Sequence, residues 1–165
     1  MMQAAFSLVV NGSVLYVCAN LAQSVKLNPW DYAGTAVVLF GFLWEAIGDY
    51  QLLKFKQNPE NKGKIITHGL YQYSRHPNYF GECVIWWGFY LFACGQPKGY
   101  YTIFSAIFIN LLLKYVSGVA MLERKQMKNP DFVQYSKRVT TPLFPWFPKQ
   151  ESDGYQKIPA EDKKE

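Results

Sequence analysis

The sequence is poor in the residues that most often bind metals or carry redox chemistry. It has two histidines, His68 and His76, and three cysteines, and none of them has a partner at the spacing of a zinc or redox motif. The cysteines, Cys18, Cys83 and Cys94, lie inside apolar stretches, so we expect buried thiols. The sequence therefore predicts no metal site.

Glycine-rich phosphate-binding motifs are missing as well. The chain contains neither GxGxxG nor GxxxxGK[ST], so any nucleotide is expected to bind without a Rossmann or Walker loop. No basic residue precedes the first apolar stretch, and we therefore expect no signal peptide.

Long apolar blocks dominate what is present. Half of the 165 residues are hydrophobic, and the mean hydropathy of -0.10 hides their segregation from the charged residues. We predict an all-α fold, a polytopic transmembrane helical bundle within residues 1–148, followed by a disordered polar tail, 149–165. About four spans are expected, at residues 4–22, 32–50, 79–95 and 100–122.

The positive charge lies beside these blocks. The net charge is +5, and the loop 51–78 carries five basic residues against the single acid Glu60. This bias places the central loop and the C-terminal tail on the cytosolic side. The lipid bilayer is therefore the expected partner, and nucleic acid is not.

The stretch Thr67–Trp87 joins this basic loop to an apolar helix and gathers polar groups at membrane depth. Taken as helical, it places Arg75, Asn78, Tyr79 and Glu82 on one face. Arg75 suits a phosphate or carboxylate, Asn78 an amide such as nicotinamide, Tyr79 a stacking or proton-donating role, and Glu82 a ribose hydroxyl. The alternative is an Arg75–Glu82 ion pair that joins helices.

Two further residues could take part in binding or catalysis. Glu45 and Asp49 are four residues apart on one helix face, where they could line a polar cavity or transfer a proton. Alternatively, they form ion pairs with Lys54, Lys56 or Lys114.

The tail after the last expected span offers more cations. Lys125 and Arg138 could bind the phosphates of a cofactor, and the alternative is a solvated basic flank. Residues 143–148 are expected to lie along the membrane interface.

Several runs closely resemble the C-terminal domain of the steroid 5-alpha-reductase-like membrane proteins. Motif order and spacing agree over roughly residues 31–149, and the best match is the branch with SRHPNYFGE; sterol reductases carry a related RHxNYxG junction. The matching runs are WEAIGDYQLLKFK (44–56), NPENKGKI, GLYQYSRHPNYFGE (69–82), WWG (86–88), VSGVAMLE (116–123) and QYSKRVTTPLFPWFP (134–148).

The resemblance implies that NADPH binds at the cytosolic side and reduces a carbon–carbon double bond in a lipid, steroid or sterol-like substrate. Glu45 and Asp49 stand where characterised reductases carry an Asn and an Asp that contact the cofactor. Lys56 stands near the position at which those reductases carry a phosphate-binding Arg. Glu45 departs from the family pattern at its position.

The remaining matches follow the same resemblance. The predicted catalytic residues are Glu45, Asp49 and Tyr79. The predicted cofactor-binding residues are Asp49, Lys56, Arg75, His76, Asn78, Glu82, Tyr135 and Arg138. A eukaryotic member is expected in the endoplasmic reticulum membrane and a bacterial one in the inner membrane.

Two alternatives remain open. Membrane methyltransferases of the isoprenylcysteine and phospholipid type share the RHPxYxG junction and bind S-adenosylmethionine there, although Glu123 lacks the neighbouring acid they carry. Family members also have more spans before residue 32, so a fragment without activity and with a structural role is the other alternative.

Overall fold

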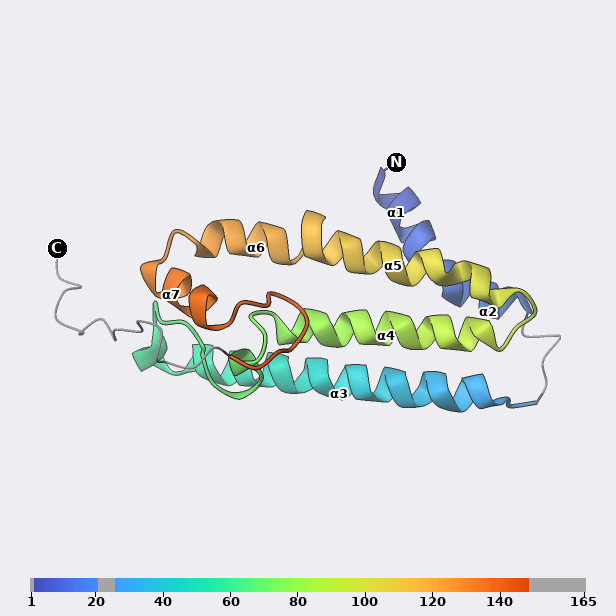
Figure 1. Ribbon diagram of the computed structural model, residues 1–165, viewed down its shortest axis with the longest axis horizontal. Coiled ribbons are helices and arrows are strands. Elements are labelled where there is room, and N and C mark those ends of the chain that lie inside the picture. Colours follow the sequence, from blue (N-terminus) through green and yellow to red (C-terminus); the bar gives the residue numbers. More distant parts are fainter. Residues whose placement is uncertain (1, 21–25, 149–165) are drawn as a thin grey trace.

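The computed structural model describes residues 2–20 and 26–148, and all regular secondary structure in these ranges is helical (Figure 1). This confirms the all-α prediction for the described part of the chain. The α-helices are α1 (Met2–Val10), α2 (Gly12–Asn20), α3 (Pro29–Gln57), α4 (Pro77–Cys94), α5 (Ile103–Leu111), α6 (Val119–Gln126) and α7 (Pro130–Arg138). The short helices are η2 (Pro59–Asn61), η3 (Gly69–Gln72), η4 (Gly99–Thr102) and the π-helical η5 (Leu112–Val116).

Helix α3 is the longest element, with 29 residues, and strong helix-start signals fix its beginning. The side chain of Asn28 accepts a backbone N–H of the first turn, and the carboxylate of Asp31 accepts the backbone N–H of Asn28 at 2.7 Å. This reciprocal pair is a capping box, and Pro29 follows at the first helical position. The span expected at 32–50 therefore lies within a longer helix.

Helices α3 and α4 are in close contact along a seam of glycines spaced seven residues apart. A Cβ on Gly41 would lie 2.8 Å from the carbonyl oxygen of Gly81, and a Cβ on Gly34 would lie 3.0 Å from that of Gly88. Seven residues are two helical turns, so each set of glycines lies on one face. Small residues at helix interfaces let backbones approach closely, as they do between membrane helices.

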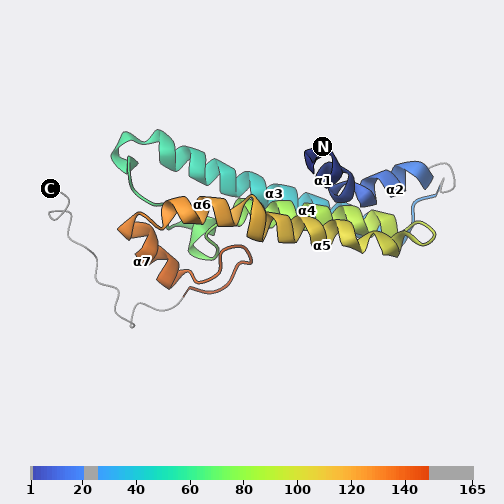
Figure 2. The same cartoon turned by 90° about the horizontal axis from the view of Figure 1, so that it is seen from above.

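Helix α4 occupies the middle of the bundle, with α3 on one side and α5 on the other (Figures 1 and 2). Its Cys83 is 1% exposed and packs in a core with Ile109, Leu113, Val119 and Leu143. The prediction of a buried thiol is confirmed for Cys83. It is wrong for Cys18, which is exposed.

Two helical stretches are long and apolar enough to cross a membrane, and they support membrane association. They are Pro29–Gln57 and Gly99–Gln126. The second stretch is a run of η4, α5, η5 and α6, with a bend at Ser117 and Gly118 between the last two. The expected third span corresponds to α4, which does not belong to these two stretches.

The expected first span, 4–22, is divided. Helix α1 ends and α2 begins around Asn11, whose side-chain amide donates to the backbone carbonyl of Ser7 at 2.8 Å. The last two residues of that span lie outside the described residues. Four spans and their orientation therefore remain a prediction.

The last described segment of the chain folds back over the start of α4. Helix α7 and the residue after it bury Phe132, Tyr135 and Val139 against Ile65 of the central loop. The segment after α7 then runs beside the loop that leads into α4 (Figure 1). The predicted disordered tail, 149–165, lies outside the described residues.

Candidate functional site

The candidate site is at the junction that leads into α4. Pro77 begins this helix, as expected for a proline at the first helical position. Arg75 therefore precedes the helix, and the prediction that it shares a helical face with Glu82 is wrong. Its backbone N–H instead donates to the carbonyl of Thr141 at 3.3 Å.

The side chain of Arg75 is buried and engages Glu123, near the end of the last long apolar stretch. Its Nε donates to Glu123 Oε1 at 2.7 Å, and its Nη2 donates to Oε2 at 3.0 Å. Its Nη1 donates to the backbone carbonyl of Val139 at 2.6 Å. The alternative of an Arg75–Glu82 ion pair is thus wrong, because Arg75 pairs with Glu123 and not with Glu82.

His76 joins the same carboxylate. Its Nε2 lies 3.2 Å from Oε1 of Glu123, and its ring stacks on Tyr79 with centroids 5.8 Å apart. Glu123 therefore joins Arg75 and His76, and through His76 it supports the first turn of α4. Glu123 is not among the site residues predicted from the sequence. The feature that could have pointed to it is an acidic residue directly before the basic residues Arg124 and Lys125.

Tyr135 anchors α7 to the same loop. Its hydroxyl donates to the backbone carbonyl of Tyr71 and lies 3.3 Å from that of Ser74. Burial raises the pKa of the Tyr135 phenol, and the charge of Arg75 opposes that rise. The predicted cofactor contact by Tyr135 is untested, and its hydroxyl is engaged by the backbone in this structure.

The C-terminal segment is tied to the loop by further hydrogen bonds. Ser74 Oγ donates to the carbonyl of Leu143 at 2.9 Å, and the backbone N–H of Trp146 donates to the carbonyl of Tyr73 at 2.9 Å. Phe144, Trp146 and Phe147 stay exposed. These bonds hold the end of the bundle together and present aromatic side chains outward.

The second part of the site lies between α3 and α4. Asn78 Nδ2 donates to Asp49 Oδ1 at 3.0 Å across the two helices. Glu45 packs against Gly81, and its carboxylate is within electrostatic range of Asp49 and Glu82. Four predicted site residues are thus together: Glu45, Asp49, Asn78 and Glu82.

Lysines do not neutralise these carboxylates. Among the described residues, neither Glu45 nor Asp49 forms an ion pair with Lys54, Lys56 or Lys114, so the ion-pair alternative is wrong. Arg75 and His76 instead pair with Glu123. The α3–α4 cluster therefore brings together the carboxyl groups of Glu45, Asp49 and Glu82 without a lysine partner among the described residues.

Two buried donors near this cluster have no hydrogen-bond partner in the described part of the chain. They are the hydroxyl of Tyr71 and the indole Nε1 of Trp44, which precedes Glu45. Burial raises the pKa of the Tyr71 phenol, and the nearby Asp49 and Tyr79 add to the rise. An unpaired buried hydroxyl beside Asp49 is available to a ligand.

Lys56 lies apart from this cluster. It is seven residues after Asp49 on α3, about 10 Å along the helix. It lines a cavity of about 270 Å³ with two other lysines. Arg138 lies near Tyr135 on α7. The structure therefore does not bring the predicted phosphate contact Lys56 together with Asn78.

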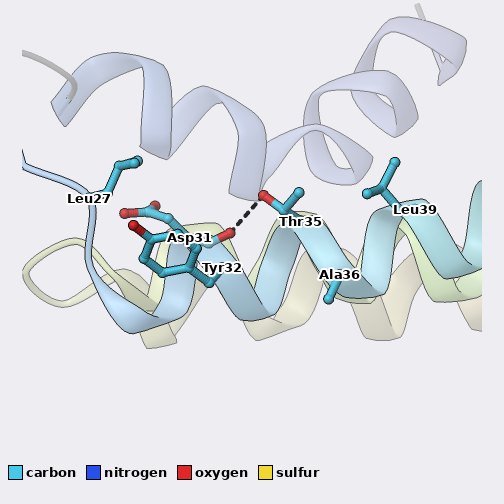
Figure 3. Close-up of a pocket in the computed structure, with 6 residues that line it drawn as sticks. All are labelled: Leu27, Asp31, Tyr32, Thr35, Ala36 and Leu39. Atoms are coloured by element: carbon cyan, nitrogen blue, oxygen red, sulfur yellow. Dashed lines mark hydrogen bonds between the residues drawn. The ribbon is translucent and has the colours of Figure 1, made fainter.

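A larger cavity, of about 370 Å³, lies at the start of α3 (Figure 3). Its lining is mainly apolar, with Leu27, Tyr32 and Leu39 among its residues. Its carboxylate, Asp31, belongs to the capping box, and Thr35 donates to the carbonyl of Asp31 at 2.8 Å. None of the predicted site residues lines it.

No group of three or more His, Cys, Asp or Glu residues in the described ranges is arranged to hold a metal ion.

Comparison with known proteins places this chain in a family. The family described as "Protein of unknown function (DUF1295)" matches residues 1–139. The chain belongs to the DUF1295 family. This family is the steroid 5-alpha-reductase-like one, so the resemblance is confirmed at that level, whereas the SRHPNYFGE branch remains a prediction.

Two curated relatives resemble parts of this DUF1295 member. One is "Probable O-methyltransferase ustE" of Ustilaginoidea virens, 36% identical over 74 residues, which are 41% of this chain and 26% of that protein. The other is "Uncharacterized protein C594.04c" of Schizosaccharomyces pombe, 26% identical over 98 residues, 48% of this chain and 28% of that protein. The matches thus span only about a quarter of each relative. No solved structure matches the chain.

Proposed function

We propose that this DUF1295 member is a multi-pass membrane oxidoreductase that uses NADPH to reduce a carbon–carbon double bond in a lipid, steroid or sterol-like substrate. The observation that supports it is the Asp49–Asn78 hydrogen bond of 3.0 Å between α3 and α4, with Glu45 and Glu82 beside it. Family membership supplies the context for this geometry.

The residues between α3 and α4 fit the nicotinamide and ribose of such a cofactor. The Asn78 amide can both donate to and accept from a carboxamide, as the resemblance implies. Asp49 and Glu82 supply oxygen acceptors for ribose hydroxyls, and the unpaired Tyr71 hydroxyl offers a donor. The fit therefore includes an orphaned polar atom as well as matching residue types.

The phosphates of NADPH would find fewer free hydrogen-bond donors in this structure than its nicotinamide and ribose. All three nitrogens of the Arg75 guanidinium already donate hydrogen bonds within the protein. Two of the five N–H groups of Arg75 therefore remain for a phosphate. Arg138 and Lys56 keep their proposed role in binding phosphate.

In this proposal the side chains have separate tasks. NADPH supplies the hydride when bound. Tyr79 lies next to the carboxylates and is held by stacking on His76, so its phenol can donate a proton to the substrate. Asp49 orients Asn78, and Glu45 completes the polar wall. The aromatic pair Trp44 and Phe80, with centroids 5.5 Å apart, borders the wall with apolar surface.

We also propose a topology and location for this enzyme. The central loop and both ends would face the cytosol, as the positive charge predicts, in the endoplasmic reticulum membrane of a eukaryote or the inner membrane of a bacterium. Residues 143–148 would lie at the interface, since Trp146 and Phe147 are 70% and 81% exposed.

A second candidate is an S-adenosylmethionine-dependent methyltransferase. The relative printed as a probable O-methyltransferase favours it. So do the three neighbouring carboxyl groups of Glu45, Asp49 and Glu82, which would attract a sulfonium cation when they are ionised. A structural role without activity is the third candidate.

Ligand-induced stabilisation separates the three. The full chain, purified in detergent, is melted with NADPH, NADH or S-adenosylmethionine, because a ligand at 100 times its Kd stabilises by about 2.7 kcal/mol. The reductase proposal expects NADPH to raise the melting temperature and Asn78→Ala to abolish the rise. Glu60→Gln, which removes an exposed acid elsewhere, should keep it.

Other outcomes assign the other candidates. Stabilisation by S-adenosylmethionine alone would replace the reductase by a methyltransferase. Stabilisation by neither ligand, with an intact fold, would leave the structural role.

A further inference from the structure

A basic cavity lies where the longest apolar helix ends, apart from the Asp49–Asn78 cluster. It has a volume of about 270 Å³ and lies between the end of α3, the loop after it and the end of α6. Three lysines and no acidic residue line it. The lining residues are Leu52, Phe55, Lys56, Asn61, Lys62, Gly63, Lys64, Ile65, Ile66 and Gln126.

The loop that closes this cavity has a defined conformation. The Asn61 side chain donates to the carbonyl of Phe55 at 3.0 Å, which folds the loop back on α3. Asn58 accepts the backbone N–H of Glu60 and caps η2. Gly63 turns the chain with φ of +80°, a conformation that glycine adopts readily. The lysines on either side of Gly63 are therefore presented by a built turn.

The position of the cavity indicates where an anionic ligand comes from. The outer face of α3 exposes Ile47, Tyr50 and Leu53, so an apolar surface leads along the helix to the cavity. Leu52 and Phe55 add apolar surface inside the cavity. Together with Lys54, the end of α3 and the loop after it carry four lysines, and clusters of four or more basic residues next to a membrane span attract anionic lipids.

We propose that this cavity binds the phosphate head group of an anionic phospholipid. Lys56, Lys62 and Lys64 neutralise the phosphate. The acyl chains follow the exposed face of α3. This site shares only Lys56 with the phosphate contacts proposed for NADPH, and it would remain if no cofactor bound.

Short-chain lipids below their micellar concentration test the site on the full chain in a nonionic detergent. Dihexanoyl-phosphatidylglycerol should raise the melting temperature in a saturable way, and dihexanoyl-phosphatidylcholine should not. The triple variant Lys56→Gln, Lys62→Gln, Lys64→Gln should bind at least roughly tenfold more weakly. Its matched control is Lys125→Gln, Lys128→Gln, Lys137→Gln, which removes the same charge outside the cavity and should bind as the native chain does.

A milder variant keeps the test informative if the triple variant fails to fold. Lys62→Gln alone should weaken the binding of phosphatidylglycerol, and Lys125→Gln alone should not.

Four results would overturn the proposal. They are equal stabilisation by phosphatidylcholine, equal loss in both triple variants, lysine-dependent stabilisation by inorganic phosphate alone, and displacement of phosphatidylglycerol by NADPH. The third would indicate a free-phosphate site and the fourth a site for the cofactor's phosphates.

Discussion

Arg75 and Glu123 are joined by two parallel hydrogen bonds, of 2.7 and 3.0 Å, although 47 residues separate them in the chain. The pair links the loop before α4 to the end of the last long apolar stretch, and its side chains are 8% and 16% exposed. A planar guanidinium and a carboxylate match in this fork geometry, and lysine cannot reproduce it.

Breaking this pair should destabilise the protein strongly. Removal of one partner leaves the other charge buried, so Arg75→Ala should lower the stability by about 3 kcal/mol. Arg75→Lys should recover only part of the loss, because it restores the charge without the fork. The melting temperature in detergent measures both.

A double-mutant cycle checks the assignment. Arg75→Ala with Glu123→Ala should cost little more than either change alone, since both remove the same pair. Additive losses would mean that the two residues act through different partners.

The glycine seam between α3 and α4 should tolerate no methyl group at its closest point. In Gly81→Ala the new Cβ would lie 2.7 Å from the Cβ of Glu45 and from the carbonyl oxygen of Gly41, so the helices must separate. We expect a loss of about 1–3 kcal/mol, typical of overpacking. Gly48→Ala is the milder control, since a Cβ there would lie 3.3 Å from the nearest atom, the backbone nitrogen of Asn78. Equal melting temperatures for the two variants would contradict this packing.

Periodicity was enough to predict the helical class. Asp49 and Asn78 lie on different helices, and only their residue types and their positions in family motifs placed both in one predicted site. The pair of Arg75 with Glu123 could not be predicted, because it depends on how residues far apart in sequence pack. The same holds for the division near Asn11, where helix packing adds to a weak local signal.

The predicted topology places Lys62 and Lys98 on opposite sides of the membrane. Both are exposed, and α4, with 18 residues, lies between the loops that carry them. In a background with Cys18, Cys83 and Cys94 replaced, a membrane-impermeant maleimide should label Lys62→Cys only from the cytosolic side. It should label Lys98→Cys only from the other side. Labelling of both variants from one side would rule out a single crossing by α4.

Alkaline pH should destabilise the protein through its buried tyrosines. Burial raises the pKa of Tyr135, so the phenol of the unfolded chain, with a pKa of about 10, loses its proton at a lower pH than the folded one. The stabilisation from the neutral phenol is therefore complete below about pH 10 and is lost as the pH rises through the folded pKa.

The variant Tyr135→Phe should reduce this alkaline loss and cost about 1 kcal/mol at neutral pH, because its hydrogen bonds to the carbonyls of Tyr71 and Ser74 disappear. The exposed Tyr50→Phe should change neither quantity. Melting temperatures between pH 8 and pH 11 test the prediction. An unchanged alkaline slope in Tyr135→Phe would mean that other groups, such as Tyr71, whose pKa is also raised by burial, dominate the loss.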